Sequence, residues 1–128
     1  MKGQRTRPAS GSKVAAKDRP HILHLHSTFA ACGKELRSVR LMNAWGTGVG
    51  HSIVSAVPEH MEAAQHISRN VPVAYPANFP SLVGRPTLGR LQKLARAMRG
   101  YDLVLTYNWG AIDAVMAHTL FGQAMDLP

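Results

Sequence analysis

The sequence has little cysteine, few acidic residues and no long apolar run. A single cysteine, Cys32, excludes an internal disulfide and fits a reducing compartment. No run of apolar residues approaches the ~20 that a membrane-spanning helix needs, and the start of the chain lacks the apolar segment of a signal peptide. We therefore expect a cytoplasmic protein without a membrane-spanning helix.

The shortage of acidic residues leaves a net charge of +8, with 15 Lys and Arg against 7 Asp and Glu. Residues 1–20 hold six of the basic residues and one Asp, so five of the eight net charges lie there. This stretch is polar and almost free of large apolar side chains, which predicts a disordered basic arm. The rest shows no groove-reading helix or aromatic platform, so we expect no specific nucleic-acid partner.

Residues 21–128 alternate between strand and helix patterns, which predicts an α/β fold with a Rossmann-like parallel sheet covered by helices. The expected strands are 21–26, 52–57, 71–75 and 101–107, and the expected helices are 34–45, 59–69, 88–99 and 111–121. Pro72 lacks an amide hydrogen, so the third strand should begin there or lie at an edge. The fourth strand is rich in apolar residues and is expected to be buried.

The third helix has the clearest amphipathic pattern. Thr87 is its expected N-cap and Gly100 its expected end. Its apolar stripe comprises Leu88, Leu91, Leu94, Ala95 and Met98, and its basic face comprises Arg90, Lys93, Arg96 and Arg99. The simpler interpretation of the basic face is exposure to solvent, and the alternative is contact with anionic lipid headgroups.

Ligands of parallel sheets bind beyond the carboxyl ends of the strands, where the strand order reverses. Right-handed crossovers should place the second and third strands on one side of the first. If the fourth strand lies on the other side, loops 27–33 and 107–110 face each other across one crevice. The sequence therefore places a candidate site between these two loops.

Three short motifs resemble the N-terminal domain of family 4 glycosyltransferases, which have the GT-B architecture of two facing Rossmann-like domains. Cys32-Gly33-Lys34-Glu35 is similar to the family's Gly-Gly-x-Glu loop, with Cys32 in place of its first glycine. Gly50-His51 and Tyr101-Asp102-Leu103-Val104 follow in the family's order. The resemblance covers about residues 20–128, and the cysteine side chain would crowd an approaching donor diphosphate.

The resemblance implies transfer of a sugar from a nucleotide-sugar donor to a sugar or lipid-linked acceptor, without a further cofactor. In the family a second domain holds most donor contacts, and that domain is missing from these residues. The alternation also calls for another strand after residue 121, so we expect one incomplete GT-B half, truncated at its C-terminus and inactive alone. The alternative is a stand-alone nucleotide- or phosphate-binding module without catalysis.

The candidate substrate-binding residues are Cys32, Gly33, Lys34, Tyr107, Asn108 and Trp109. The first three could bring a donor phosphate to a helix N-terminus, and the last three could contact an acceptor sugar. For each set a structural role stays open: a plain tight turn, a solvated lysine, and a tryptophan packed between helix and sheet. A buried or half-buried thiol is expected for Cys32, and the catalytic residues stay unknown.

Two histidines of the first strand, His24 and His26, should lie on one face, next to His21. No cysteine or carboxylate lies at a spacing that would complete a zinc site, so no metal is expected. His26, near the crevice, is a candidate substrate contact. His118 is expected to be structural.

Overall fold

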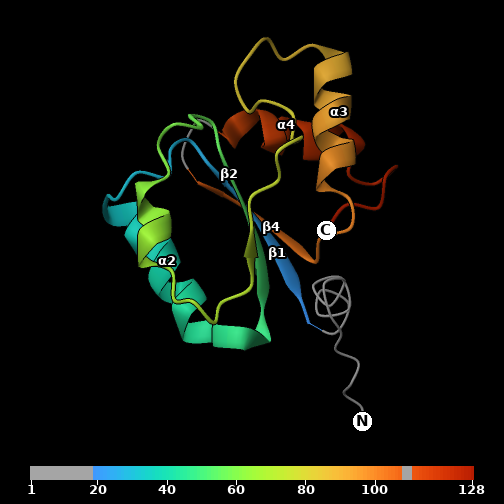
Figure 1. Ribbon diagram of the computed structural model, residues 1–128. Helices are drawn as coiled ribbons and strands as arrows, with labels where there is room; N and C mark the ends of the chain where they lie inside the picture. The colour runs from blue at the N-terminus through green and yellow to red at the C-terminus, as the bar shows by residue number, and fades with distance from the viewer. Residues whose placement is uncertain (1–18, 108–110) are drawn as a thin grey trace.

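A computed structural model describes residues 19–107 and 111–128, and it confirms the α/β class. Four parallel strands form one sheet in the order β3-β2-β1-β4 (Figure 1). The strands are β1 His21–His26, β2 Gly50–Ser55, β3 Val73–Ala74 and β4 Leu103–Tyr107. Strands β2 and β3 lie on one side of β1, as the crossover argument predicts, and β4 lies on the other side, so the strand order reverses between β1 and β4.

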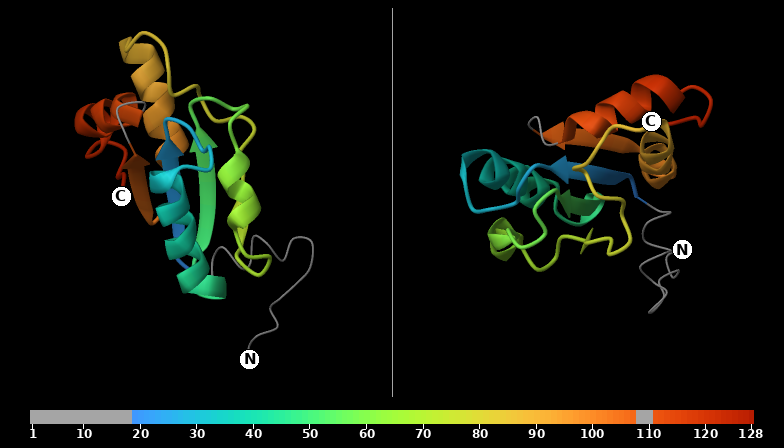
Figure 2. Two further views of the ribbon diagram at one scale, coloured as in Figure 1. Left: turned by 90° about the vertical axis from the view of Figure 1, so that its left-hand side faces the viewer. Right: turned by 90° about the horizontal axis from the view of Figure 1, so that it is seen from above.

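The helices cover the two faces of the sheet in separate groups (Figures 1 and 2). They are α2 Gly33–Trp45, α3 Leu88–Met98 and α4 Ile112–Phe121, with the short 3-10 helices η2 Gly46–Gly48 and η3 Glu62–His66. Helix α2 and η3 lie on one face, and α3 and α4 pack together on the other. Within the described residues no helix is long and apolar enough to cross a membrane.

Alternation along the strands divides the core into two clusters. Leu23 and Leu25 of β1 point toward α3 and α4, where they meet Leu94 and Ala117. On the opposite face, Ile53 of β2 packs in a cluster that α2 completes with residues such as Met42. Because strand side chains alternate between faces, β1 also turns its histidines 24 and 26 toward α2.

Two expected helix features are confirmed in α3. The Thr87 side chain accepts a hydrogen bond from the Arg90 amide, as an N-cap does. Leu91, Leu94, Ala95 and Met98 are buried. The prediction for Leu88 was wrong, because this first-turn residue is 67% exposed.

Arg90 does not belong to a solvated basic face. Its guanidinium forms an ion pair with Asp113 of α4, and Nη2 donates to the Ser81 carbonyl at 2.8 Å. Lys93, Arg96 and Arg99 are exposed as expected. Arg90 is therefore a structural link between α3, α4 and the preceding loop.

Two further expectations were wrong. The expected helix over 59–69 shrinks to η3, because the Asn43 side chain binds the His66 carbonyl and the Ser68 amide and ends it. The fourth strand is an edge strand rather than a buried one, and Leu103 is 44% exposed. The edge position predicted from Pro72 is confirmed, since β3 closes the other side of the sheet.

Candidate functional site

The candidate site lies where β1 and β4 end side by side. His26 and Tyr107 are register partners in this strand pair. After β1 the chain passes through a loop into α2, which begins at Gly33. The structure therefore brings loop 27–33 and the end of β4 to the same edge of the sheet (Figure 2). The predicted contacts Asn108 and Trp109 lie outside the described residues.

His26 is the most unusual side chain at this edge. Its ring is fully buried, stacks on Tyr107 at a centroid distance of 4.0 Å, and contacts Phe29 at 4.8 Å. Neither ring nitrogen has a hydrogen-bond partner in the described structure. Burial, assisted by the positive charge of Lys34, lowers the pKa of His26 to about 4. A neutral imidazole with unused donor and acceptor capacity therefore lies at the switch point.

A chain of hydrogen bonds runs inward from Tyr107. The Ser38 hydroxyl donates to the Tyr107 hydroxyl at 3.4 Å, and that hydroxyl lies 3.1 Å from Nδ1 of His24. Nε2 of His24 lies 2.9 Å from Nδ1 of His51 on β2. Burial, followed by the neighbouring histidines, lowers the pKa of His24 to about 3. Burial also lowers the pKa of His51 to about 4, with His21 as the smaller cause.

One arrangement of protons that satisfies these bonds runs inward from Ser38. If Tyr107 accepts from Ser38, its own proton is available for Nδ1 of His24, which then donates from Nε2 to Nδ1 of His51. The proton of neutral His51 is then on Nε2, and that buried nitrogen has no partner in the described structure. The chain holds the Tyr107 ring against His26.

Sequence reasoning missed Glu35 as a buried group. This carboxylate is in the first turn of α2, is 1% exposed, and its Oε1 has no partner in the described structure. Helical spacing was a usable signal, because residue 35 shares the inward face of α2 with Ser38, Val39 and Met42. His26 and Glu35 are thus two buried polar groups with unused hydrogen-bonding capacity near the start of α2.

The three predicted residues at the start of α2 are all on the surface. Cys32 is exposed, so the expectation of a buried or half-buried thiol was wrong, and its side chain makes no cap bond. A Cβ added at Gly33 would meet nothing within 4 Å, so packing within this fold does not require glycine there. Lys34 is exposed beside this turn. The first turn of α2 is therefore open to an approaching group.

From the other two motifs of the resemblance, Gly50 and Tyr101-Asp102 lie at the opposite, amino-terminal end of the sheet. A Cβ added at Gly50 would come within 2.9 Å of Nδ1 of His21. Asp102 accepts a 2.7 Å hydrogen bond from the His21 amide, and the Tyr101 ring contacts the His21 ring at 5.3 Å. These residues hold the beginnings of β1, β2 and β4 together, away from the crevice.

The described residues contain no group of three or more His, Cys, Asp and Glu side chains that could hold a metal ion. His24 and His26 do lie on one face of β1, as predicted, with rings 6.4 Å apart. His21 is on the other face, where its Nε2 lies 2.9 Å from the Ser52 hydroxyl. His118 is exposed, and its Nε2 lies 2.8 Å from the Pro128 carbonyl.

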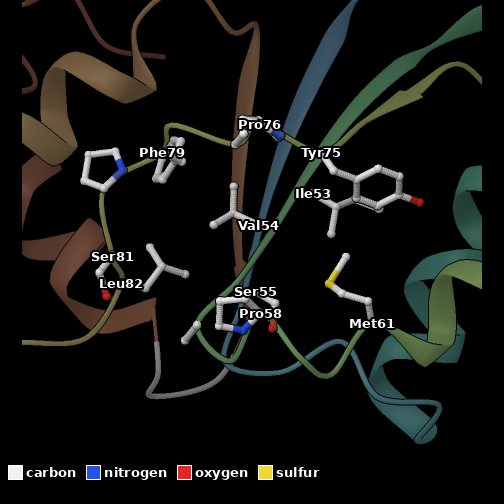
Figure 3. A pocket seen from close by; sticks show the side chains of 13 residues that line it. Ile53, Val54, Ser55, Pro58, Met61, Tyr75, Pro76, Phe79, Ser81 and Leu82 are labelled. Atoms are coloured by element: carbon white, nitrogen blue, oxygen red, sulfur yellow. The ribbon is translucent and has the colours of Figure 1, made fainter.

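A separate cavity of about 390 Å³ opens beside the carboxyl half of β2 (Figure 3). Its walls come from Ile53 and Val54 on one side and from segment 75–82 on the other, including Tyr75 and Phe79. Most of these side chains are apolar. The hydroxyl of Ser55 donates to the Val57 carbonyl, and that of Ser81 to the Val83 carbonyl.

Comparisons with protein-family models, with curated proteins and with solved structures find no match to this chain. The parallel sheet and its switch point are therefore shown by the structure of the chain itself.

Proposed function

We propose that this chain forms the acceptor-side half of a glycosyltransferase of the GT-B type. Such an enzyme transfers a sugar from a nucleotide-sugar donor to a sugar or lipid-linked acceptor. The observation that carries the proposal is the crevice at the β1–β4 switch point, a groove of about 360 Å³ that Lys34 of the first turn of α2 lines together with Tyr107. Parallel α/β sheets bind ligands at this position.

The charge and polarity of the crevice support the same proposal. The positive end of the α2 dipole and the Lys34 ammonium favour a negatively charged group such as a diphosphate. Deeper in, the unused nitrogens of His26 offer a donor and an acceptor to a hydroxyl-bearing ligand. In the proposed enzyme the reacting sugar would lie between these two regions, and a second domain would close over it.

The second candidate function is a stand-alone module that binds a nucleotide or a phosphate without catalysis. The unpartnered buried groups His26 and Glu35 favour it, because such groups gain most from a ligand that satisfies them. This function needs only the residues on the switch-point edge. It predicts strong ligand-dependent stabilisation of the chain alone.

The deciding experiment is calorimetric titration of the complete natural protein that contains this chain with a panel of UDP-, GDP- and ADP-sugars. One donor should bind, and in the presence of acceptor it should release its nucleoside diphosphate. Lys34→Ala should weaken donor binding, whereas Lys93→Ala, an exposed lysine on α3, should not. Absence of binding across the panel would contradict the glycosyltransferase proposal. Strong stabilisation of residues 1–128 alone by nucleotide, without sugar transfer, would favour the binding module.

The proposal includes a cytoplasmic location, at the inner face of the membrane where the acceptor is lipid-linked. The exposed side chains of Lys93, Arg96 and Arg99 are the groups that would contact anionic headgroups. Co-sedimentation with vesicles containing phosphatidylserine tests this contact. Binding should fall as salt rises, and neutral vesicles serve as the control.

A further inference from the structure

The cavity of about 390 Å³ lies where the pairing of β2 with β3 stops. In the described sheet these strands pair only as far as Ser52 and Ala74. The next bond of this parallel ladder would run from the amide of residue 76 to the Ile53 carbonyl. Residue 76 is a proline, which has no amide hydrogen, so the ladder ends and the chain leaves the edge of β2.

Two backbone groups of β2 point toward this cavity. The amide and carbonyl of one strand residue point to the same side, and that side alternates along the strand. The His51 amide donates outward to the Pro72 carbonyl, whereas the Ala56 amide donates inward to β1. The Ile53 carbonyl and the Ser55 amide are on the outward side, and both residues line the cavity. An acceptor and a donor, separated by one residue, therefore face the same space.

The apolar walls of the cavity come from both sides of the sheet. Ile53 and Met61 pack with the core cluster on the α2 face, and Phe79 and Leu82 pack with the cluster on the face of α3 and α4 (Figure 3). The space between them continues the plane of the sheet beyond β2. A flat ring in this plane would have apolar side chains on both of its faces and the edge of β2 at its rim.

The lining favours an uncharged ligand. None of the described residues that line the cavity is charged. The hydroxyls of Ser55 and Ser81 already donate to backbone carbonyls of their own segments. An ionised group would lose its hydration here without gaining a counter-charge. A space of this volume is of the size that small-molecule sites have in proteins.

We propose that this cavity binds the base of an uncharged nucleoside. The Watson–Crick edge of each common base carries an N–H group next to a hydrogen-bond acceptor. The N–H group donates to the Ile53 carbonyl, the neighbouring acceptor receives the Ser55 amide, and the ring lies between the apolar walls. This site goes beyond the proposed function and does not depend on it, because it shares no lining residue with the groove at the switch point.

An extended peptide is a poorer occupant. Strand β3 occupies the edge of β2 up to Ala74, and β2 itself ends at Ser55. One carbonyl and one amide are left between these two points, whereas added strands gain their affinity from a row of main-chain hydrogen bonds. The cavity is also on the β3 side of the sheet, opposite to β4, where a further strand would be added.

The test is titration of the complete natural protein with adenosine, guanosine, cytidine and uridine, followed by saturation-transfer NMR. At least one of these nucleosides should bind saturably, and the one that binds identifies the base. The same nucleoside with its donor N–H replaced by N-methyl should bind at least about tenfold more weakly, because the Ile53 carbonyl loses its partner and the methyl group meets the strand edge. For adenosine this analogue is the dimethylated amine, which retains the ring nitrogen as acceptor.

Two variants place the binding in the cavity. Ala77 is an exposed lining residue, and the indole of Ala77→Trp should fill the space and abolish binding. The matched control is Val83→Trp, at a position that is 56% exposed and outside the lining, which should leave the affinity unchanged. Pro76→Ala restores an amide that can donate to the Ile53 carbonyl, so it should weaken binding. Pro86→Ala, in the same loop but outside the lining, should not.

The outcomes separate this site from an unspecific apolar hollow. Equal binding of a nucleoside and its N-methyl analogue, or undiminished binding in Ala77→Trp, would overturn the proposal. Absence of binding by all of the nucleosides would overturn it as well, as would binding of an extended peptide in their place. If Ala77→Trp does not fold in a circular dichroism melt, the methylated analogues and Pro76→Ala decide.

Discussion

At the scale of single residues, His26 offers the clearest test of the site. Its imidazole is buried between Tyr107 and Phe29 with both nitrogens unpartnered, a cost of roughly 1–3 kcal/mol for a buried polar group. His26→Phe keeps an aromatic ring in the stack and removes that cost. We expect the free energy of unfolding at neutral pH to rise by about 1 kcal/mol, measured by urea denaturation.

The matched control for this substitution is His66→Phe, at an exposed position in η3, which should change stability little. If His26 contacts ligand, the same His26→Phe variant should lose affinity while it gains stability. A clear loss of stability would show instead that the ring nitrogens are satisfied in solution, for instance by an ordered water.

At the scale of secondary-structure elements, Arg90 connects α3 to α4 and to the loop before α3. Its guanidinium pairs with Asp113 and donates to the carbonyls of Ser81, Gly84 and Arg85. Lysine has one ammonium and cannot reproduce this fork. Arg90→Lys should therefore cost about 2 kcal/mol of stability and speed proteolysis in segment 76–86, as followed by mass spectrometry. Arg96→Lys, exposed on the same helix, should do neither.

The pairing of β1 with β2 places three buried histidines on one face, and this predicts acid sensitivity. Burial lowers the pKa of His24 to about 3 and those of His26 and His51 to about 4. Above an ordinary pKa of 6.5 both the folded and unfolded states are neutral at these rings. Below it the unfolded chain binds protons that the folded protein cannot, so stability is lost as the pH falls from about 6.5 toward 4.

The slope of stability against pH measures how many protons are involved. Between pH 6 and 5 it should approach about three protons taken up on unfolding, and His26→Phe should reduce it to about two. Urea denaturation at half-unit pH steps provides the slope. A flat profile through this range would mean that the rings are solvated or charged in the folded protein.

The same elements show what the sequence could predict. Alternation predicted the four strands, and crossover handedness placed the second and third on one side of the first, because both are local or general rules. The side on which the fourth strand lies was left open. Strand β4 was expected to be buried because its residues are apolar. Its position at the edge of the sheet follows from the arrangement of all four strands, which a local pattern does not contain. Helix 59–69 ended early because of Asn43, which is distant in sequence.

The candidate site, too, was predictable only in part. Its location followed from the strand order, and Lys34 and Tyr107 do lie at the switch point. The contact of His24 with His51 depends on the register between two strands, and the stack of His26 on Tyr107 depends on a second register. Neither register can be predicted from a local sequence pattern. Gly50 and Tyr101-Asp102, from two motifs of the resemblance, proved to lie at the far end of the sheet, whereas His51 bonds to His24.

At the scale of the whole molecule, the sheet separates two core clusters of the described residues. Among the described residues, the buried members of the two clusters lie between Leu23 and Ala117, and the polar composition of residues 1–18 predicts that this arm adds nothing to them. Deleting these residues should leave the thermal midpoint within about 2 °C of the full chain, as measured by circular dichroism. A larger fall would mean that the arm packs against the folded part.

The same deletion lowers the net charge of the protein and is expected to leave its fold unchanged. It removes five Lys and Arg residues and one Asp, and so half of the net charge of +8. Binding to random-sequence DNA should therefore be weak, steeply salt-dependent and largely lost with the arm, as expected of counterion release without base recognition. Nucleotide-sugar binding by the complete natural protein should survive the deletion, because the crevice is built by β1, α2 and β4. Loss of both activities together would place the arm in the site and would contradict the division of the chain at residue 20.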